Sequence, residues 1–325
     1  MKFFRLILIF FVAMVSLQSC KKEYAEFWKE DIKTTERVKI TDISGDYFNT
    51  DIPLENFKVK YPWFQGTVPD EDYANRRTDT AEIKIYQEAA KKINQAQLQQ
   101  DLSVLFSRVR FYFPKFKTPQ VYLYSSSLQG ILDPVFFRPE ENMLFVDISA
   151  FMGEKNPNYN SLEEYFKKSM NPQNMIPKIS EIVAETLVIH KPDQNKFVDK
   201  IVSQGKIMIL QDVFLPHTPD ELKIGYTREQ QDWAVANEGN IWNYFIENNL
   251  IFSDDARLSE RFIAPGPFSK FYTEVDVKSS PRVGVFTGWQ ICRSFFVRNP
   301  KISLQDFLKM NATDIFNQSK YKPLN

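Results

Sequence analysis

The sequence predicts an α+β fold that is mostly helical and holds one small sheet. Segments rich in β-branched and aromatic residues occur together in one block, at 121–124, 135–138 and 143–147. Helical periodicity comes before this block and dominates the chain after it. Strands confined to one block between helices are typical of α+β proteins with a single sheet.

The elements before and within the strand block follow from local patterns. Residues 21–60 are polar, with a weak alternation at 37–41, which predicts a tether that leads into a short strand. Apolar residues then repeat at three- and four-residue steps over 79–113, which predicts helix as far as Pro114. The spacing of the last two strands predicts a hairpin.

The chain after Asp147 is expected to be helical. Ser161 with Glu164, and Thr227 with Gln230, have the spacing of a capping box. The expected helices span 161–169, 175–190, 194–213, 227–251, 254–261, 282–298 and 303–310.

Composition excludes several classes of protein. The 325 residues contain 41 Lys and Arg against 41 Asp and Glu, with 43% apolar and 25% charged residues, as in globular proteins and unlike disordered or fibrous chains. A pI near 6.8 gives no electrostatic reason to expect nucleic acid as a partner. Two Cys and two His exclude a disulfide framework and a Cys/His zinc module.

The N-terminus has the pattern of a lipoprotein signal peptide. Lys2 and Arg5 precede an apolar stretch over 6–17 that is short for a membrane span. The following Leu-Gln-Ser-Cys resembles a bacterial lipobox. We therefore expect residues 1–19 to be removed and Cys20 to carry the lipid, including palmitate, that anchors the chain. Lys21 in the next position favours the outer membrane under the familiar sorting rule, with the leaflet left open.

The remaining chain is expected to form one domain. Residues 20–60 are assigned to the lipidated Cys, the tether and the first strand, and residues 61–325 to a single α+β domain. Cys292 lies in an apolar segment and is expected to be a buried small hydrophobe. Gly284 and Gly288 indicate a close approach of helices.

Common catalytic patterns are missing from the sequence. It has no G-x-S-x-G elbow and no phosphate-binding glycine loop, so we expect no cofactor. Of its two histidines, His217 falls in a proline-flanked surface loop. Asp254 and Asp255 are expected to cap a helix, and Glu181 with Glu185 to form the polar edge of one.

The helix at 175–190 invites comparison with zinc peptidases, whose H-E-x-x-H motif places two His ligands and a general base on one helical face. Glu185 occupies the position of the base, but Ala184 and Val188 occupy the two ligand positions. Downstream, Gln204 stands where an E-G-x-A segment would supply a third ligand. Aliphatic groups cannot bind zinc and a neutral amide binds it poorly. We therefore expect a zincin-like architecture without its metal ligands, or a chance similarity of an ordinary core helix.

A second group of candidate residues lies in the helix expected at 227–251. Trp242 belongs to an aromatic stripe, which is more often core than binding surface, while Glu238 is one of several polar residues beside it. Such residues could line a cleft for a peptide or a glycan. The candidate binding residues are Glu185, Gln204, Glu238 and Trp242.

Several segments together resemble the gliding motility lipoprotein GldB family of Bacteroidetes over nearly the whole chain. The segments that carry the resemblance are 61–64 with 69–70, 144–148, 151–153, 204–207, 226–230, 233–234, 237–242, 244–248, 261–262, 267–271 and 288–291. The resemblance implies a role in gliding together with other envelope proteins of the gliding machinery. The family looks like a zincin relative that has lost its ligands.

The function expected is therefore that of a lipid-anchored, non-catalytic binding or assembly component, a pseudo-peptidase without metal. Two alternatives remain open at this point. One is a zinc peptidase with unconventional ligands drawn from His190, His217, Glu185 and Glu238. The other is an envelope chaperone or structural lipoprotein outside motility.

Overall fold

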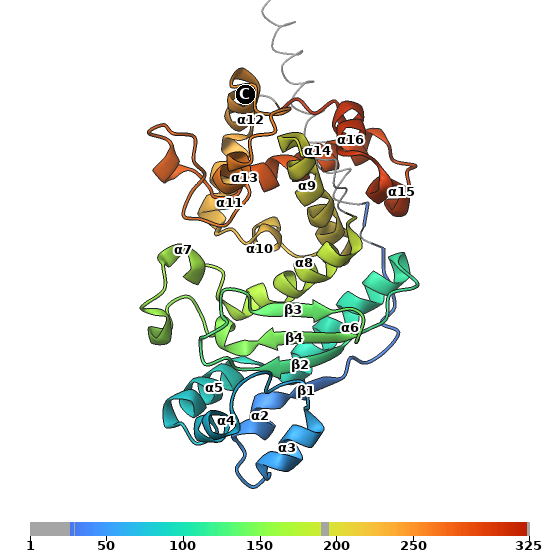
Figure 1. Cartoon of the computed structure of the whole chain (residues 1–325). Coiled ribbons are helices and arrows are strands. Elements are labelled where there is room, and N and C mark those ends of the chain that lie inside the picture. The colour runs from blue at the N-terminus through green and yellow to red at the C-terminus, as the bar shows by residue number, and fades with distance from the viewer. Residues whose placement is uncertain (1–26, 29, 190–194, 324–325) are drawn as a thin grey trace, which may run out of the picture. The chain divides into compact units, whose positions relative to one another are not determined.

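The computed structural model describes residues 27–323 except 29 and 190–194 (Figure 1). Contacts within the chain divide it into two compact units. Residues 33–186 form the first, which we call the sheet unit, and residues 187–325 with those up to Ile32 form the second, the helical unit. The single domain expected over 61–325 stays a prediction.

The sheet unit contains one four-stranded mixed sheet with the order β1-β2-β4-β3 (Figure 1). Its strands are β1 (Ile40–Asp42), β2 (Gln120–Tyr124), β3 (Val135–Arg138) and β4 (Met143–Asp147). Strand β2 pairs in parallel with β1 and β4, and β3 pairs antiparallel with β4. The strand block, the short first strand and the hairpin are confirmed, and with them the α+β class.

One face of this sheet carries a continuous row of aromatic rings. Phe145 is paired in register with Tyr122 on one side and with Phe136 on the other. Its ring stacks on theirs with centroid distances of 5.2 and 4.5 Å. Trp63 meets Tyr122 and Phe145 edge-on. These rings join a buried cluster that also contains Ile43, Tyr47, Phe57, Tyr61 and Tyr73.

The helices of the sheet unit differ from expectation before the strand block. Residues expected to be tether and loop form three short helices, because aromatic side chains from this segment supply the cluster that covers the sheet. The long helix expected over 79–113 breaks at Asn94, whose side chain caps a new helix by accepting from Gln97 N. These helices are α2 (Ile43–Phe48), α3 (Leu54–Lys60), α4 (Asp70–Arg76), α5 (Thr80–Lys92) and α6 (Gln95–Tyr112).

After the sheet, this unit continues with short turns and two helices. Helix α7 (Glu164–Lys167) is shorter than expected, and the capping box at Ser161 is wrong because the N-cap residue is Glu163, without a side-chain cap. Helix α8 (Met175–Leu187) ends where the units divide. The 3₁₀ turns are η1 (Ile148–Phe151), η2 (Pro157–Tyr159) and η3 (Pro172–Asn174).

The helical unit is built around α9 (Phe197–Phe214) and α14 (Val283–Arg298), which lie side by side (Figure 1). The helix expected at 227–251 splits at Asn237, although the capping box of Thr227 and Gln230 is confirmed. The other helices are α10 (Asp220–Ile224), α11 (Arg228–Ala236), α12 (Glu238–Glu247), α13 (Arg257–Phe262), α15 (Leu304–Lys309) and α16 (Ala312–Ser319), with a 3₁₀ turn η4 (Asp276–Lys278). None of the helices in the described ranges combines the length and apolarity that a membrane span requires.

Candidate functional site

Helix α8 carries the positions that correspond to H-E-x-x-H. Ala184 is fully buried, and Val188, just past the helix end, is 5% exposed. Glu185 between them is exposed. The two ligand positions thus hold aliphatic side chains without lone pairs, so the local chemistry is that of a packing surface. Within the described ranges there is no group of three or more His, Cys, Asp or Glu side chains that could hold a metal ion.

The segment proposed to carry a third ligand has a packing role that the structure makes explicit. Gln204 is half-buried on α9, and Gly205 next to it is fully enclosed. A Cβ atom at position 205 would lie 2.3 Å from the carbonyl oxygen of Gly288 and 2.7 Å from Sγ of Cys292. The glycine of this motif-like segment is therefore required by the contact between α9 and α14.

Two of the four candidate binding residues meet at one corner of the helical unit. The hydroxyl of Tyr321 donates a hydrogen bond to Oε1 of Glu238 at 3.0 Å. Its ring lies edge-on to Trp242, with centroids 5.0 Å apart. Burial and the neighbouring carboxylate hold the pKa of Tyr321 well above its usual range. Because Glu185 belongs to the sheet unit, the four candidates do not form one site within a unit.

Polar neighbours on α11 and α12 have local roles. The side-chain amides of Asn237 and Asn248 donate to the carbonyls of Trp233 and Tyr244, one turn earlier in each case. These contacts satisfy carbonyl groups at helix ends, where the helix itself offers no partner. These local contacts explain why asparagine occurs at positions 237 and 248, and no bound ligand is needed to account for them.

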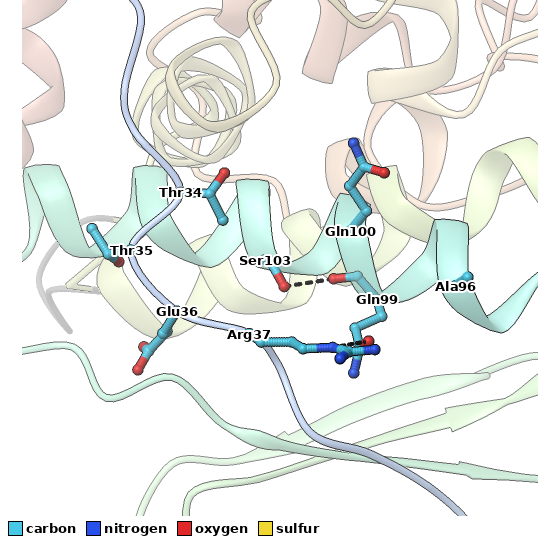
Figure 2. Close-up of a pocket in the computed structure, with 8 residues that line it drawn as sticks. All are labelled: Thr34, Thr35, Glu36, Arg37, Ala96, Gln99, Gln100 and Ser103. Carbon is cyan, nitrogen blue, oxygen red and sulfur yellow. Dashed lines mark hydrogen bonds between the residues drawn. The ribbon is translucent and has the colours of Figure 1, made fainter.

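An open pocket of about 410 Å³ lies in the sheet unit, where residues 34–37 run beside the first turns of α6 (Figure 2). Two of its polar side chains, Ser103 and Gln99, are hydrogen-bonded within the pocket wall or to Val38 beside it. Ser103 Oγ accepts from Val38 N and donates to Gln99 O, and Arg37 bonds to the Gln99 side chain. The lining residues are Thr34, Thr35, Glu36, Arg37, Ala96, Gln99, Gln100 and Ser103. The pocket offers hydrogen bonds to a polar ligand but no nucleophile with a base.

The end of β4 holds a buried carboxyl group that sequence reasoning missed. Asp147 is completely buried, and its Oδ1 accepts hydrogen bonds from Ser126 N, Ser149 N and Ser149 Oγ at 3.2, 3.0 and 2.6 Å. Among the described residues none bonds to its Oδ2. Burial raises the pKa of this carboxyl group, against the hydrogen bonds that lower it. The signal in the sequence is an acidic residue that directly follows an apolar strand.

A second buried polar group, also missed from the sequence, links α9, α10 and α14. Asp212 accepts hydrogen bonds from Trp289 Nε1 at 2.8 Å, from Lys223 Nζ at 2.9 Å and from two nitrogens of Arg293. Arg293 also forms a paired contact with Asp220. The two cations and two carboxylates balance one another. Although burial opposes it, the pKa of Asp212 lies far below its usual range because of these cations.

The family model for gliding motility protein GldB matches residues 25–323, which span both units. The chain belongs to the GldB family. It is accordingly a gliding-motility-related lipoprotein of the cell envelope, as the family is. No curated protein and no solved structure gives a significant match.

Several remaining predictions for this GldB-family chain can be placed in the structure. Cys292 is a free, fully buried thiol whose pKa is raised by burial, and His217 is exposed in a loop, both as predicted. Asp255 accepts from Arg257 N at the start of α13, as expected for a carboxylate at a helix N-terminus, although the N-cap position itself is occupied by Ala256 and not by Asp254 or Asp255. Cys20 and His190 lie outside the described residues.

Proposed function

We propose that this GldB-family chain is an outer-membrane lipoprotein, anchored through Cys20, that acts in gliding by binding other envelope proteins of the gliding machinery without catalysing a reaction. One observation carries the non-catalytic part. The two positions that would hold a zinc ion, Ala184 and Val188, are buried aliphatic side chains. Glu185, which occupies the position of the general base, is exposed.

We also propose that the sheet unit keeps a zincin-like architecture without the metal ligands. Its sheet has one antiparallel edge strand, and α8 follows the sheet after a single short helix. The position of Glu185 in α8, where the zinc peptidase motif places its general base, supports this relationship.

The binding role is assigned to the corner formed by Glu238, Trp242 and Tyr321. Glu238 and the ring of Tyr321 are half-buried and offer a partner a charged hydrogen-bond acceptor beside apolar area. Trp242 is 8% exposed, and its contact with Tyr321 holds that ring in place. Their mutual contacts support this assignment, because a preorganised surface loses less conformational entropy when a partner binds.

Complementation of a deletion strain tests the non-catalytic role. Colony spreading should be lost on deletion and restored by the natural chain and by Glu185→Gln, since a scaffold needs no general base. Cys20→Ser should fail to restore it, with the chain recovered in the soluble fraction. Loss of spreading with Glu185→Gln, at normal protein level, would contradict the proposal and favour a peptidase. Spreading that is unchanged by deletion would favour an envelope chaperone instead.

Metal content provides a separate test. The purified chain should contain less than one equivalent of zinc and keep its melting temperature in the presence of a chelator. Stoichiometric zinc, together with a lower melting temperature in chelator, would support the unconventional-ligand peptidase and reject the proposal.

Capture of envelope proteins from the producing cells tests the binding corner. Glu238→Gln and Trp242→Leu should each weaken recovery of gliding-machinery proteins. Glu247→Gln, the same change at an exposed position of the same helix, should not. Melting temperatures identify any variant that has lost its fold. Equal recovery by folded Glu238→Gln and Glu247→Gln proteins would remove the corner from the proposal.

A further inference from the structure

The first described residues of the chain pack on the helical unit. The ring of Trp28 stands edge-on to that of Phe296 near the end of α14, with centroids 5.4 Å apart at an interplanar angle of 84°. Phe296 is 1% exposed and lies 4.6 Å from the ring of Phe307 on α15. Trp28 therefore packs on the C-terminal end of α14, next to the contact between α14 and α15.

This contact limits how far the helical unit can lie from a lipid on Cys20. Only eight residue steps separate Cys20 from Trp28. A fully extended chain spans at most about 3.6 Å per residue, so Trp28 lies within about 29 Å of the lipidated residue whatever path the chain takes. The end of α14 is held near the membrane surface by this short connection.

The C-terminal segment at the same end of the unit carries an excess of positive charge, in a chain whose formal net charge is zero. Between residues 298 and 322 the sequence holds five basic residues and two acidic ones, Asp306 and Asp314, while the exposed Glu30 and Asp31 follow Trp28. The basic residues, all exposed, are Arg298, Lys301, Lys309, Lys320 and Lys322.

Two contacts bring these basic residues toward Trp28. Ser294 Oγ donates to Ser319 O at 2.9 Å, which sets the end of α16, with Lys320, beside the last turns of α14. The contact between the rings of Phe296 and Phe307 likewise brings Lys309, two residues after Phe307, toward the end of α14. The ammonium group of Lys309 lies 3.6 Å from the carboxylate of Asp306. The adjoining residues 298–301 carry no acidic side chain.

We propose that this basic corner, defined as Trp28, Arg298, Lys301, Lys309 and Lys320, rests on the anionic headgroups of the membrane that holds the lipid. The inference rests on the lipid anchor of the proposed function and adds a second, protein-made contact. Tryptophan favours the membrane–water interface, and cationic side chains near an anionic surface are attracted to it. A lipid and a basic patch together orient a protein where a lipid alone leaves it free to turn.

Probe depth in vesicles tests the orientation with the lipidated full chain. A fluorescent label is placed at Lys301→Cys or, in a matched chain, at Val277→Cys, which is 75% exposed just before the start of α14. Helix α14 alone has 16 residues, about 24 Å, between these sites. The natural Cys292 is buried and remains unlabelled. In vesicles of phosphatidylglycerol and phosphatidylcholine with a headgroup quencher, the label at 301 should be quenched more strongly. If the chain is bound to the membrane but the label at 301 is quenched no more strongly than the label at 277, the proposal for the basic corner is wrong and the lipid anchor still stands.

Charge reversal tests the headgroup chemistry. The label is moved to Lys309→Cys, and quenching by the headgroup quencher reports the fraction of chain whose basic corner lies on the membrane. On phosphatidylglycerol vesicles, Lys301→Glu should lower the ratio of chain with the corner on the membrane to chain with the corner away from it by about fivefold or more. Lys278→Glu, at an exposed site away from the corner, should leave the ratio unchanged. The difference should vanish on pure phosphatidylcholine. An equal effect of the two reversals overturns the proposal. Recovery of the unmodified chain in the soluble fraction overturns the lipid anchor and this inference together.

Discussion

Gly288 faces the carbonyl oxygen of Ile201 so closely that a Cβ atom at position 288 would lie 1.8 Å from that oxygen. The obstacle is backbone, which cannot rotate away as a side chain can. Gly205 on α9 meets the backbone of Gly288 in the same way. Helices α9 and α14 thus touch through their main chains, and the core of the helical unit depends on this distance.

We predict that Gly288→Ala lowers the free energy of unfolding by about 3 kcal/mol, because the added methyl group forces the two helices apart. Gly266→Ala serves as the control in the same unit, since its Cβ would find only Phe268 O, at 3.7 Å. Urea denaturation of both variants gives the comparison. A Gly288→Ala chain as stable as the control would contradict this prediction, because it would show that α14 can shift away from α9 without loss of stability.

Asp212→Asn should lower the free energy of unfolding by about 3 kcal/mol or more at neutral pH. The change leaves Lys223 and Arg293 buried with Asp220 as their one remaining carboxylate in this network. Asp220→Asn should lower the free energy of unfolding by less, because the side chain of Asp220 is 34% exposed. Thermal unfolding at pH 7 distinguishes them, and an equal loss would contradict the central place of Asp212.

The same network predicts acid sensitivity. The pKa of Asp212 is lower in the folded chain than the value of about 3.9 expected for an unfolded chain. Its contribution to stability is therefore fully present above that value and is lost as the pH falls below it. Between pH 5 and pH 2 the free energy of unfolding should fall more steeply for the natural chain than for Asp212→Asn. Parallel curves would be the contrary result.

Arg77 is expected to be essential for holding the end of α2 and the turn after it, over residues 47–52. Its guanidinium donates to the carbonyls of Tyr47, Asn49 and Ile52 at 2.6, 2.7 and 2.8 Å while 7% exposed. Arg77→Lys keeps the charge, but the lysine ammonium cannot reach three acceptors in different directions. We therefore predict that the free energy of unfolding falls by about 3 kcal/mol. Arg138→Lys, at an exposed ion pair, should change stability by less than about 1 kcal/mol. Chemical denaturation compares them, and similar losses would refute the special role of Arg77.

Asp147 should behave in the opposite way to Asp212 as the pH changes. Its folded-state pKa is raised, so its ionised form is penalised at neutral pH and the penalty disappears as the pH falls through that pKa. Asp147→Asn retains an oxygen for Ser126 and Ser149, and we predict a stability about 1 kcal/mol above the natural chain at pH 8. That advantage should shrink on acidification. Asp147→Ala, which removes the acceptor, should be destabilising at every pH. An Asn variant that gains stability on acidification relative to the natural chain would contradict the buried-acid account.

The patterns that predicted this fold correctly are local ones. Strand composition located β2, β3 and β4, and the Thr227–Gln230 pair located the start of α11, because each depends on residues within one element. The helices at 43–76 were missed for the opposite reason. Their side chains gain stability from a cluster that includes Tyr122 and Phe145, which lie more than 45 residues further along the chain.

The candidate site divides along the same line. That Ala184, Val188 and Gln204 offer no good metal ligand at the spacing of a zinc motif can be seen from the sequence alone, and the structure adds that the first two are buried. That Glu238 meets Tyr321, whereas Glu185 belongs to another unit, depends on chain path and could not be predicted from spacing. Asp147 and Asp212 escaped notice because isolated acidic residues look alike until their burial is known.

By itself, the sequence determined the α+β class, the lipoprotein signal pattern and membership in the GldB family, since composition, periodicity and motif spacing are properties of neighbouring residues. Only the tertiary structure decided the division into two units, the main-chain contact of Gly288 with Ile201 and the placing of Trp28 on Phe296. Each of these joins residues far apart in the chain, and packing selects such pairs by shape and burial, which no local pattern records.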